Sequence, residues 1–137
     1  FWQSPGAGIT EYFAEQVSHR PPVSAIFMKN TTRSIKCGGQ VWTRSQFKGN
    51  SALSIMDGFF SVELATWDES YHMTMPTFSA TGLLYGSMRM EVVGSTVLTC
   101  PQSGLSATID WQPKPATRGE DQANHLRAVV VSASGDE

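Results

Sequence analysis

The side chains best suited to chemistry in this chain lie together in residues 15–22, whose sequence is EQVSHRPP. Six positions hold a carboxylate, an amide, a hydroxyl, an imidazole and a guanidinium, and two prolines follow. The guanidinium offers a planar fork of hydrogen-bond donors and the imidazole adds another, which suits an anionic group, phosphate above all. His19 and Arg20 are therefore candidate phosphate-binding residues.

The positions of these side chains depend on the local backbone. The prolines stiffen the chain in front of an apolar run that is typical of a strand. In an undistorted strand Gln16 and Ser18 would share a face with Arg20, and Glu15 would share the other face with His19. A turn or bulge near Ser18 is therefore required before both cationic groups can reach one phosphate. We treat Glu15, Gln16 and Ser18 as supporting residues. The alternative is a surface turn held by the prolines, with the glutamate in a cross-strand ion pair.

Length and charge restrict the class of protein. The chain has 137 residues, of which 40% are hydrophobic and 16% are charged, as expected for one globular domain with a core. Its net charge is -2, whereas a general nucleic-acid binder usually carries a basic excess. No apolar run approaches the roughly 20 residues that a membrane-spanning helix needs.

The residue pattern predicts neither a metal site nor a catalytic site. Cys37 and Cys100 are the only cysteines, and they form no C-x-x-C pair. Two free thiols are the main interpretation, and a single disulfide is the alternative. G-x-S-x-G and phosphate-cradling glycine motifs are absent, and His72 and His125 have no evident partner. We expect no enzyme activity, metal or cofactor.

Short strands recur along the chain. Asp57-Gly58 is a strong hairpin signal, and Gly38-Gly39 suggests a bulge or a tight bend. Residues 105–111 alternate cleanly, with Leu105 on the apolar side and Asp110 on the polar side. An irregular entry is expected at residues 1–9, although 9–16 could form a strand or a helical turn, and a loop is expected at 113–124. The spacing predicts an all-β meander, sandwich or barrel. The expected strands are 23–29, 35–43, 50–56, 59–67, 71–75, 78–84, 87–93, 96–100, 105–111 and 126–132.

The octapeptide resembles the EQVSHHPP fingerprint of the oxysterol-binding protein family, with Arg20 in place of the second histidine. Weaker similarities follow in family order as far as residue 115. Residues 47–51 are similar to F-x-G-x-S, and residues 69–77 are similar to E-x-Y…P. Residues 103–109 are similar to T-G-Y-x-A-x-I, and K-P follows at 114–115.

This resemblance implies a fold and a function. The fold would be an antiparallel meander forming part of a large incomplete β-barrel around a lipid tunnel. Residues 1–137 would be the central part of that domain, without its lid and C-terminal helices. The activity would be transfer of a sterol or phospholipid between cytoplasmic membrane faces, in exchange for phosphatidylinositol 4-phosphate. The protein would be peripheral at organelle membranes and contact sites.

The resemblance also implies roles for particular residues. His19 would grip the head-group phosphate, and Arg20 would stand at the second histidine position. Lys48 could add a basic contact near a membrane, although an ordinary loop lysine is the alternative. Five aromatic residues could line the tunnel or form an ordinary core: Trp42, Phe59, Phe60, Trp67 and Trp111. A different class of protein, a β-sandwich or barrel interaction module with a degenerate head-group site, is the alternative function.

Overall fold

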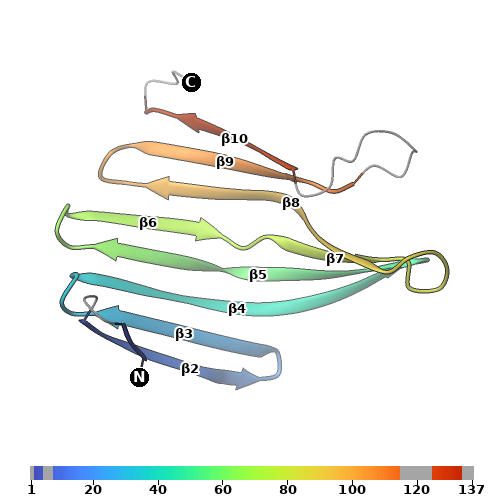
Figure 1. The fold of residues 1–137 in the computed structure, drawn as a ribbon, viewed down its shortest axis with the longest axis horizontal. Coiled ribbons are helices and arrows are strands. Elements are labelled where there is room, and N and C mark those ends of the chain that lie inside the picture. Colours follow the sequence, from blue (N-terminus) through green and yellow to red (C-terminus); the bar gives the residue numbers. More distant parts are fainter. Residues whose placement is uncertain (1, 5–7, 115–124, 134–137) are drawn as a thin grey trace.

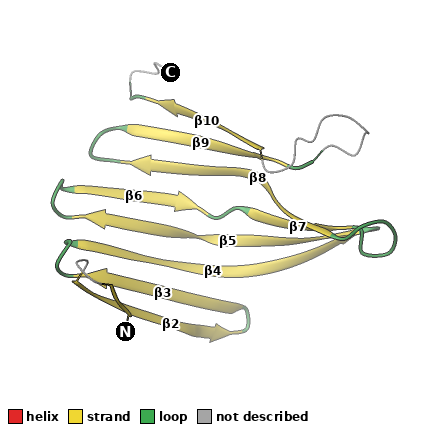
Figure 2. Cartoon of the chain, viewed as in Figure 1, coloured by secondary structure: helices red, strands yellow, loops and turns green. Residues whose placement is uncertain are grey.

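The computed structural model describes residues 2–4, 8–114 and 125–133. These residues form ten strands in one antiparallel sheet and no helix (Figures 1 and 2). The predicted all-β antiparallel meander is confirmed. The strands are β1 (Trp2–Ser4), β2 (Gly8–His19), β3 (Pro22–Asn30), β4 (Ile35–Lys48), β5 (Ser51–Leu64), β6 (Glu69–Thr74), β7 (Thr77–Thr81), β8 (Arg89–Cys100), β9 (Leu105–Gln112) and β10 (His125–Val131).

Strand order in the sheet follows the sequence, except that β6 and β7 both lie between β5 and β8. β5 pairs with β4 along 14 residue pairs, and on its other edge it pairs first with β7 and then with β6. β8 pairs with β7 through its first five residues and with β9 from Gly94 onward. In Figure 1 the sheet therefore forks where β8 leaves β9 and follows β7.

The two faces of the sheet differ in polarity. Cross-strand partners share a face and alternate residues change face, so the registers assign each side chain to one side. One side, the apolar face, carries Ile26, Met28, Val41, Met56, Phe60, Val62, Tyr71, Met73, Phe78, Leu98, Ile109 and Trp111. The other side, the polar face, carries most of the charged strand residues together with apolar ones such as Phe27, Ile55 and Phe59. Its polar residues include Lys29, Lys36, Gln40, Arg44, Lys48, Asp57, Glu63, His72, Glu91, Ser95, Thr108 and Asp110.

The described sheet has almost no buried core. Only Cys100, Ser79 and Thr96 are buried among the described residues, whereas Phe13, Phe47 and other large apolar side chains are exposed. A sheet with one apolar face is normally stable only when a second layer covers that face. The described part of the chain supplies no such layer, so its apolar face is an open surface.

Asp57-Gly58 does not form the predicted hairpin, because it lies inside the continuous strand β5. The turn between β4 and β5 is at Gly49-Asn50 instead. Gly58 has φ +134°, and a Cβ there would collide with the Gln40 carbonyl oxygen on β4. Glycine is therefore required at position 58 because two strands approach closely there. In the sequence alone, such a glycine looks the same as a turn glycine.

Other predicted boundaries were also wrong. The predicted strands 87–93 and 96–100 form a single strand, β8, which begins only at Arg89, and the predicted strand 78–84 ends at Thr81. Gly38-Gly39 is not a bulge, since the ladders of β4 with β3 and β5 continue through it, and a Cβ on Gly39 would collide with the Phe59 carbonyl oxygen. The expected irregular entry contains β1, and most of the expected loop 113–124 lies outside the described residues.

Arg44 and Asp57 form a two-bond ion pair across β4 and β5. The Arg44 hydrogen bond lowers the pKa of Asp57, so the pair adds stability above the unfolded pKa of about 4 and loses it as pH falls through the folded pKa. We expect Asp57→Asn to lower the urea midpoint at pH 7 by more than at pH 2.5. Asp68→Asn, in an exposed turn, is the control. An equal loss at both pH values would contradict this role.

Candidate functional site

The candidate phosphate-binding residues lie at the tip of the β2–β3 hairpin. His19 ends β2 and pairs with Pro22, the first residue of β3, while Arg20 and Pro21 form the turn. The Arg20–Pro21 peptide bond is cis. Both candidate side chains are exposed, and no described ion pair includes either of them. The hairpin therefore presents an imidazole and a guanidinium side by side to solvent.

The register of this hairpin contains the bulge that the two residues require. Gln16 pairs with Ser24 and Ser18 pairs with Val23, so Val17 is an extra residue on β2. A bulge of this kind reverses the facing of the residues beyond it. Beyond the bulge, the side chains of β2 therefore lie on the opposite face from the one that regular alternation would give.

The bulge changes which side chains share a face. His19 now lies on the apolar face with Gln16, whereas Ser18 lies on the polar face with Glu15. The facing of an undistorted strand, with Glu15 beside His19 and Gln16 beside Ser18, therefore does not apply, and the irregularity expected near Ser18 is this bulge. Sequence periodicity cannot detect a single inserted residue in a strand. Gln16 is the supporting residue that remains on the same side as the imidazole.

The five aromatic candidates for a tunnel wall separate into three groups. Phe60 and Trp111 lie on the apolar face, while Trp42 and Phe59 lie on the polar face. Trp67 lies in the β5–β6 turn and is 65% exposed. Only the first two are thus placed to contact a ligand on the apolar face.

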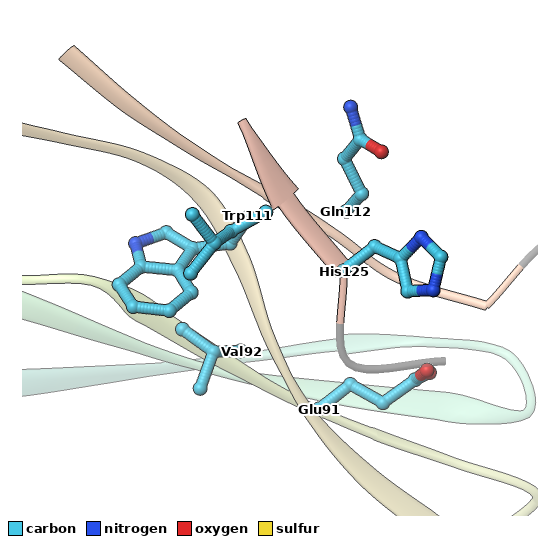
Figure 3. A pocket seen from close by; sticks show the side chains of 6 residues that line it. Glu91, Val92, Trp111, Gln112 and His125 are labelled. Carbon is cyan, nitrogen blue, oxygen red and sulfur yellow. The ribbon is translucent and has the colours of Figure 1, made fainter. Parts of the chain in front are cut away.

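A small pocket at the fork of the sheet was not predicted from the sequence (Figure 3). Trp111 and Val92 lie on one side of it, and His125, Gln112 and Glu91 lie on the other. The indole Nε1 of Trp111 donates a hydrogen bond to the Thr96 hydroxyl at 2.9 Å, which fixes the ring. Gly94, with φ +82°, lies in β8 where the pairing with β9 begins, and a glycine inside a strand pattern is the sequence signal that marks this fork.

Metal and thiol chemistry contribute little to this surface. The described residues contain no group of three or more His, Cys, Asp and Glu side chains that could hold a metal ion. Cys37 and Cys100 are both free thiols. Burial raises the pKa of Cys37, and hydrogen bonds from Ser103 lower that of Cys100. No helix in the described ranges has the length and apolar character needed to cross a bilayer.

Comparisons with known proteins match the whole sheet. The family described as Oxysterol-binding protein matches residues 3–137. An oxysterol-binding protein homolog from Schizosaccharomyces pombe is 43% identical over 107 residues, which are 78% of this chain and 22% of that protein. This chain therefore spans about a fifth of the length of that relative.

Two solved structures share the fold. The Osh1 ORD domain in complex with cholesterol has a TM-score of 0.80 and 23% identity, and the match covers 98% of this chain and 31% of that one. The Osh3 ORD in complex with PI(4)P from Saccharomyces cerevisiae has a TM-score of 0.72 and 21% identity, over 93% and 39% of the two chains. The open sheet thus corresponds to about a third of each solved chain.

Proposed function

This chain belongs to the oxysterol-binding protein family, and from that premise we propose that it is the central wall of a lipid-transfer domain. The apolar part of one lipid lies against the apolar face of the sheet, and a phosphorylated head group binds at the tip of the β2–β3 hairpin. The domain exchanges a sterol or phospholipid for phosphatidylinositol 4-phosphate between cytoplasmic membrane faces at organelle contact sites. No bond is made or broken, so the function is not enzymatic.

The position of His19 is the observation that carries this proposal. The bulge at Val17 places this imidazole on the apolar face, at the end of a surface formed by side chains such as Ile26 and Met28. A lipid on that surface gains roughly 25 cal/mol for each Å² of apolar area removed from water. Its head group would then meet His19 and Arg20 where the apolar surface ends.

Arg20 can perform the head-group role without a second imidazole. A guanidinium donates bidentate hydrogen bonds to phosphate and is charged at all physiological pH values. The Osh3 domain was solved with PI(4)P and the Osh1 domain with cholesterol, which supports a site for both kinds of lipid in this fold.

Extraction of labelled phosphatidylinositol 4-phosphate from liposomes by the complete domain tests this assignment. We expect His19→Ala and Arg20→Ala each to weaken extraction by about tenfold to a hundredfold, because each removes a charge-assisted hydrogen bond. His72→Ala and Arg33→Ala are matched controls, since both side chains are exposed and lie away from the β2–β3 turn.

Melting temperatures should stay close to that of the wild type in all four variants, because none of these side chains is buried. Extraction that is equally strong with and without His19 and Arg20 would reject the head-group assignment. Sterol extraction that persists in both variants would assign only the phosphate to this turn.

A further inference from the structure

The end of the sheet formed by the β4–β5 turn and the β7–β8 loop is an organised tip. Residues 82–88 form the loop, and Asn50 of the neighbouring turn holds it. The Asn50 side-chain oxygen accepts hydrogen bonds from the backbone N–H groups of Leu84 at 2.7 Å and Tyr85 at 3.1 Å. Its Nδ2 donates to the Tyr85 carbonyl at 2.8 Å. The Asn50 side chain therefore attaches the loop to the rigid sheet, in addition to the backbone hydrogen bonds that Gly82 and Leu83 donate to the Asn50 carbonyl.

Large apolar side chains cover this tip and reach solvent. Leu84 is 76% exposed, Tyr85 72% and Met88 67%. Phe47 on β4 is 77% exposed and Met90 on β8 is 71% exposed. Soluble domains usually expose large apolar side chains singly. A cluster of them exposed to this degree therefore marks an interaction surface.

The registers arrange the apolar residues of the tip in one row. Phe47 pairs with Ala52, Ala52 with Ala80, and Ala80 with Met90, so these four residues lie side by side on the apolar face. Small side chains occupy the middle of the row and large ones its two ends. The row continues the apolar surface of the loop onto the sheet.

The adjacent row on the polar face ends in two cations. Lys48 pairs with Ser51, Ser51 with Thr81, and Thr81 with Arg89. Residues 46–52 and 80–90 contain Lys48 and Arg89 and no Asp or Glu. The tip thus combines an apolar side and a basic side, one row of side chains apart.

We propose that this tip inserts into the interfacial region of an anionic lipid bilayer. Leu84, Tyr85 and Met88 enter at the boundary between head groups and acyl chains, where aromatic and aliphatic side chains are favoured. Lys48 and Arg89 lie at the level of the negatively charged head groups. An apolar protein partner would not require the two cations that border the apolar row.

The placement of the tip relative to the rest of the sheet agrees with this orientation. In Figure 1 the β2–β3 turn, the β4–β5 turn and the β7–β8 loop point toward the same side, but the β2–β3 turn stops well short of the tip, since β3 pairs with β4 only as far as Trp42 and β4 continues to Lys48. His19 and Arg20 therefore lie on the side of the sheet that would approach the bilayer, set back from the tip. The β5–β6 turn, which contains the exposed Trp67, lies at the opposite end.

The conformation of the loop is set before any contact with lipid. Gly82 has φ +75°, and a Cβ there would collide with the Ser87 carbonyl oxygen, so the loop closes tightly on itself. The backbone N–H of Gly82 also donates a hydrogen bond to the Asn50 carbonyl at 3.0 Å. Insertion of a loop that is already ordered costs less conformational entropy than the folding of a free segment.

Sedimentation with liposomes of phosphatidylcholine and phosphatidylserine tests the tip. These liposomes contain no phosphoinositide and no sterol, so the result does not depend on the proposed lipid exchange. In the complete domain we expect Leu84→Ser combined with Tyr85→Ser to weaken binding by at least about tenfold. Lys48→Glu and Arg89→Glu should each weaken it by about fivefold or more, with the loss reduced at high salt.

Two controls lie at the other end of the sheet. Trp67→Ser removes an exposed aromatic side chain from the β5–β6 turn, and Arg33→Glu reverses an exposed charge in the β3–β4 turn. Both should bind liposomes as the wild type does. Equal weakening by the controls and the tip variants would overturn the proposal, because it would indicate a nonspecific surface effect.

A tryptophan introduced at the tip supplies a measurement that does not depend on loss of binding. Tyr85→Trp should add fluorescence that brominated lipids quench, whereas quenching of the wild-type protein should be weaker. Absence of added quenching in a variant that still binds liposomes would overturn the proposal and would mean that another segment or a protein partner covers the tip.

Discussion

Replacement of Gly58 with valine is expected to lower the free energy of unfolding by about 4 kcal/mol or more. The glycine has φ +134°, a conformation that β-branched residues avoid. A Cβ would collide with the Gln40 carbonyl oxygen and would lie 3.0 Å from the Cα of Val41. Both contacts are with backbone, which cannot move aside as a flexible side chain can. The affected ladder is the longest in the sheet, since β4 and β5 share 14 residue pairs.

Gly49→Ala is the matched control for this prediction. Gly49 also has a positive φ, +57°, but no atom lies within 4 Å of a Cβ at that position. The substitution should cost only about 1 to 2 kcal/mol, the ordinary price of a left-handed alanine. Urea unfolding of the complete domain measures both changes. Similar losses in the two variants would show that the close approach of β4 and β5 at Gly58 is not the cause.

Loss of the Asn50 side chain is expected to loosen the β7–β8 loop at Leu84 and Tyr85, while the backbone hydrogen bonds from Gly82 and Leu83 to the Asn50 carbonyl remain. Asn50→Ala removes two hydrogen bonds to the backbone N–H groups of Leu84 and Tyr85 and one to the Tyr85 carbonyl. At about 1 kcal/mol for each bond, the loop loses about 3 kcal/mol of local stability. Amide hydrogens of Leu84 and Tyr85 should therefore exchange about a hundredfold faster, as measured by hydrogen exchange.

Asn50→Asp separates the hydrogen-bond effect from removal of the side chain. The aspartate retains the oxygen that accepts from Leu84 and Tyr85 but loses the donor to the Tyr85 carbonyl. Protection of the two amides should recover in large part. Amides of β9, such as that of Ile109, should exchange at the wild-type rate in both variants because β9 pairs with β8 only from Gly94 onward, away from the part of β8 that follows the loop. Unchanged exchange of Leu84 and Tyr85 in Asn50→Ala would contradict the role of this side chain.

Period-two patterns predicted the strands most successfully. Residues 105–111 alternate without interruption, and β9 places Leu105, Ile109 and Trp111 on one face as expected. Asp57-Gly58 was wrongly predicted as a turn, because Gly58 permits a close strand approach and Asp57 pairs with Arg44. The true turn at Gly49-Asn50 has similar residue types, so tertiary packing distinguishes the two sites.

The candidate site was predictable in composition but not in orientation. The octapeptide identified His19 and Arg20, and the structure places them together at a hairpin tip. A turn or bulge was expected near Ser18, and the bulge at Val17 reverses the facing that a regular strand would give to Ser18 and His19. The exposed tip was missed because residues 82–88 were divided between two predicted strands, although Asn50 holds them as one loop.

The nearest-neighbour order of the sheet has a consequence for synthesis of the chain. From β1 to β6 each strand pairs with the one made immediately before it, so every hairpin can close as soon as its second strand leaves the ribosome. β7 then returns to a free stretch of β5, Ser51–Ile55, whose edge no earlier strand has occupied. No later strand has to displace an existing pair. The order in which the ribosome makes the strands is therefore also an order in which the sheet can be assembled.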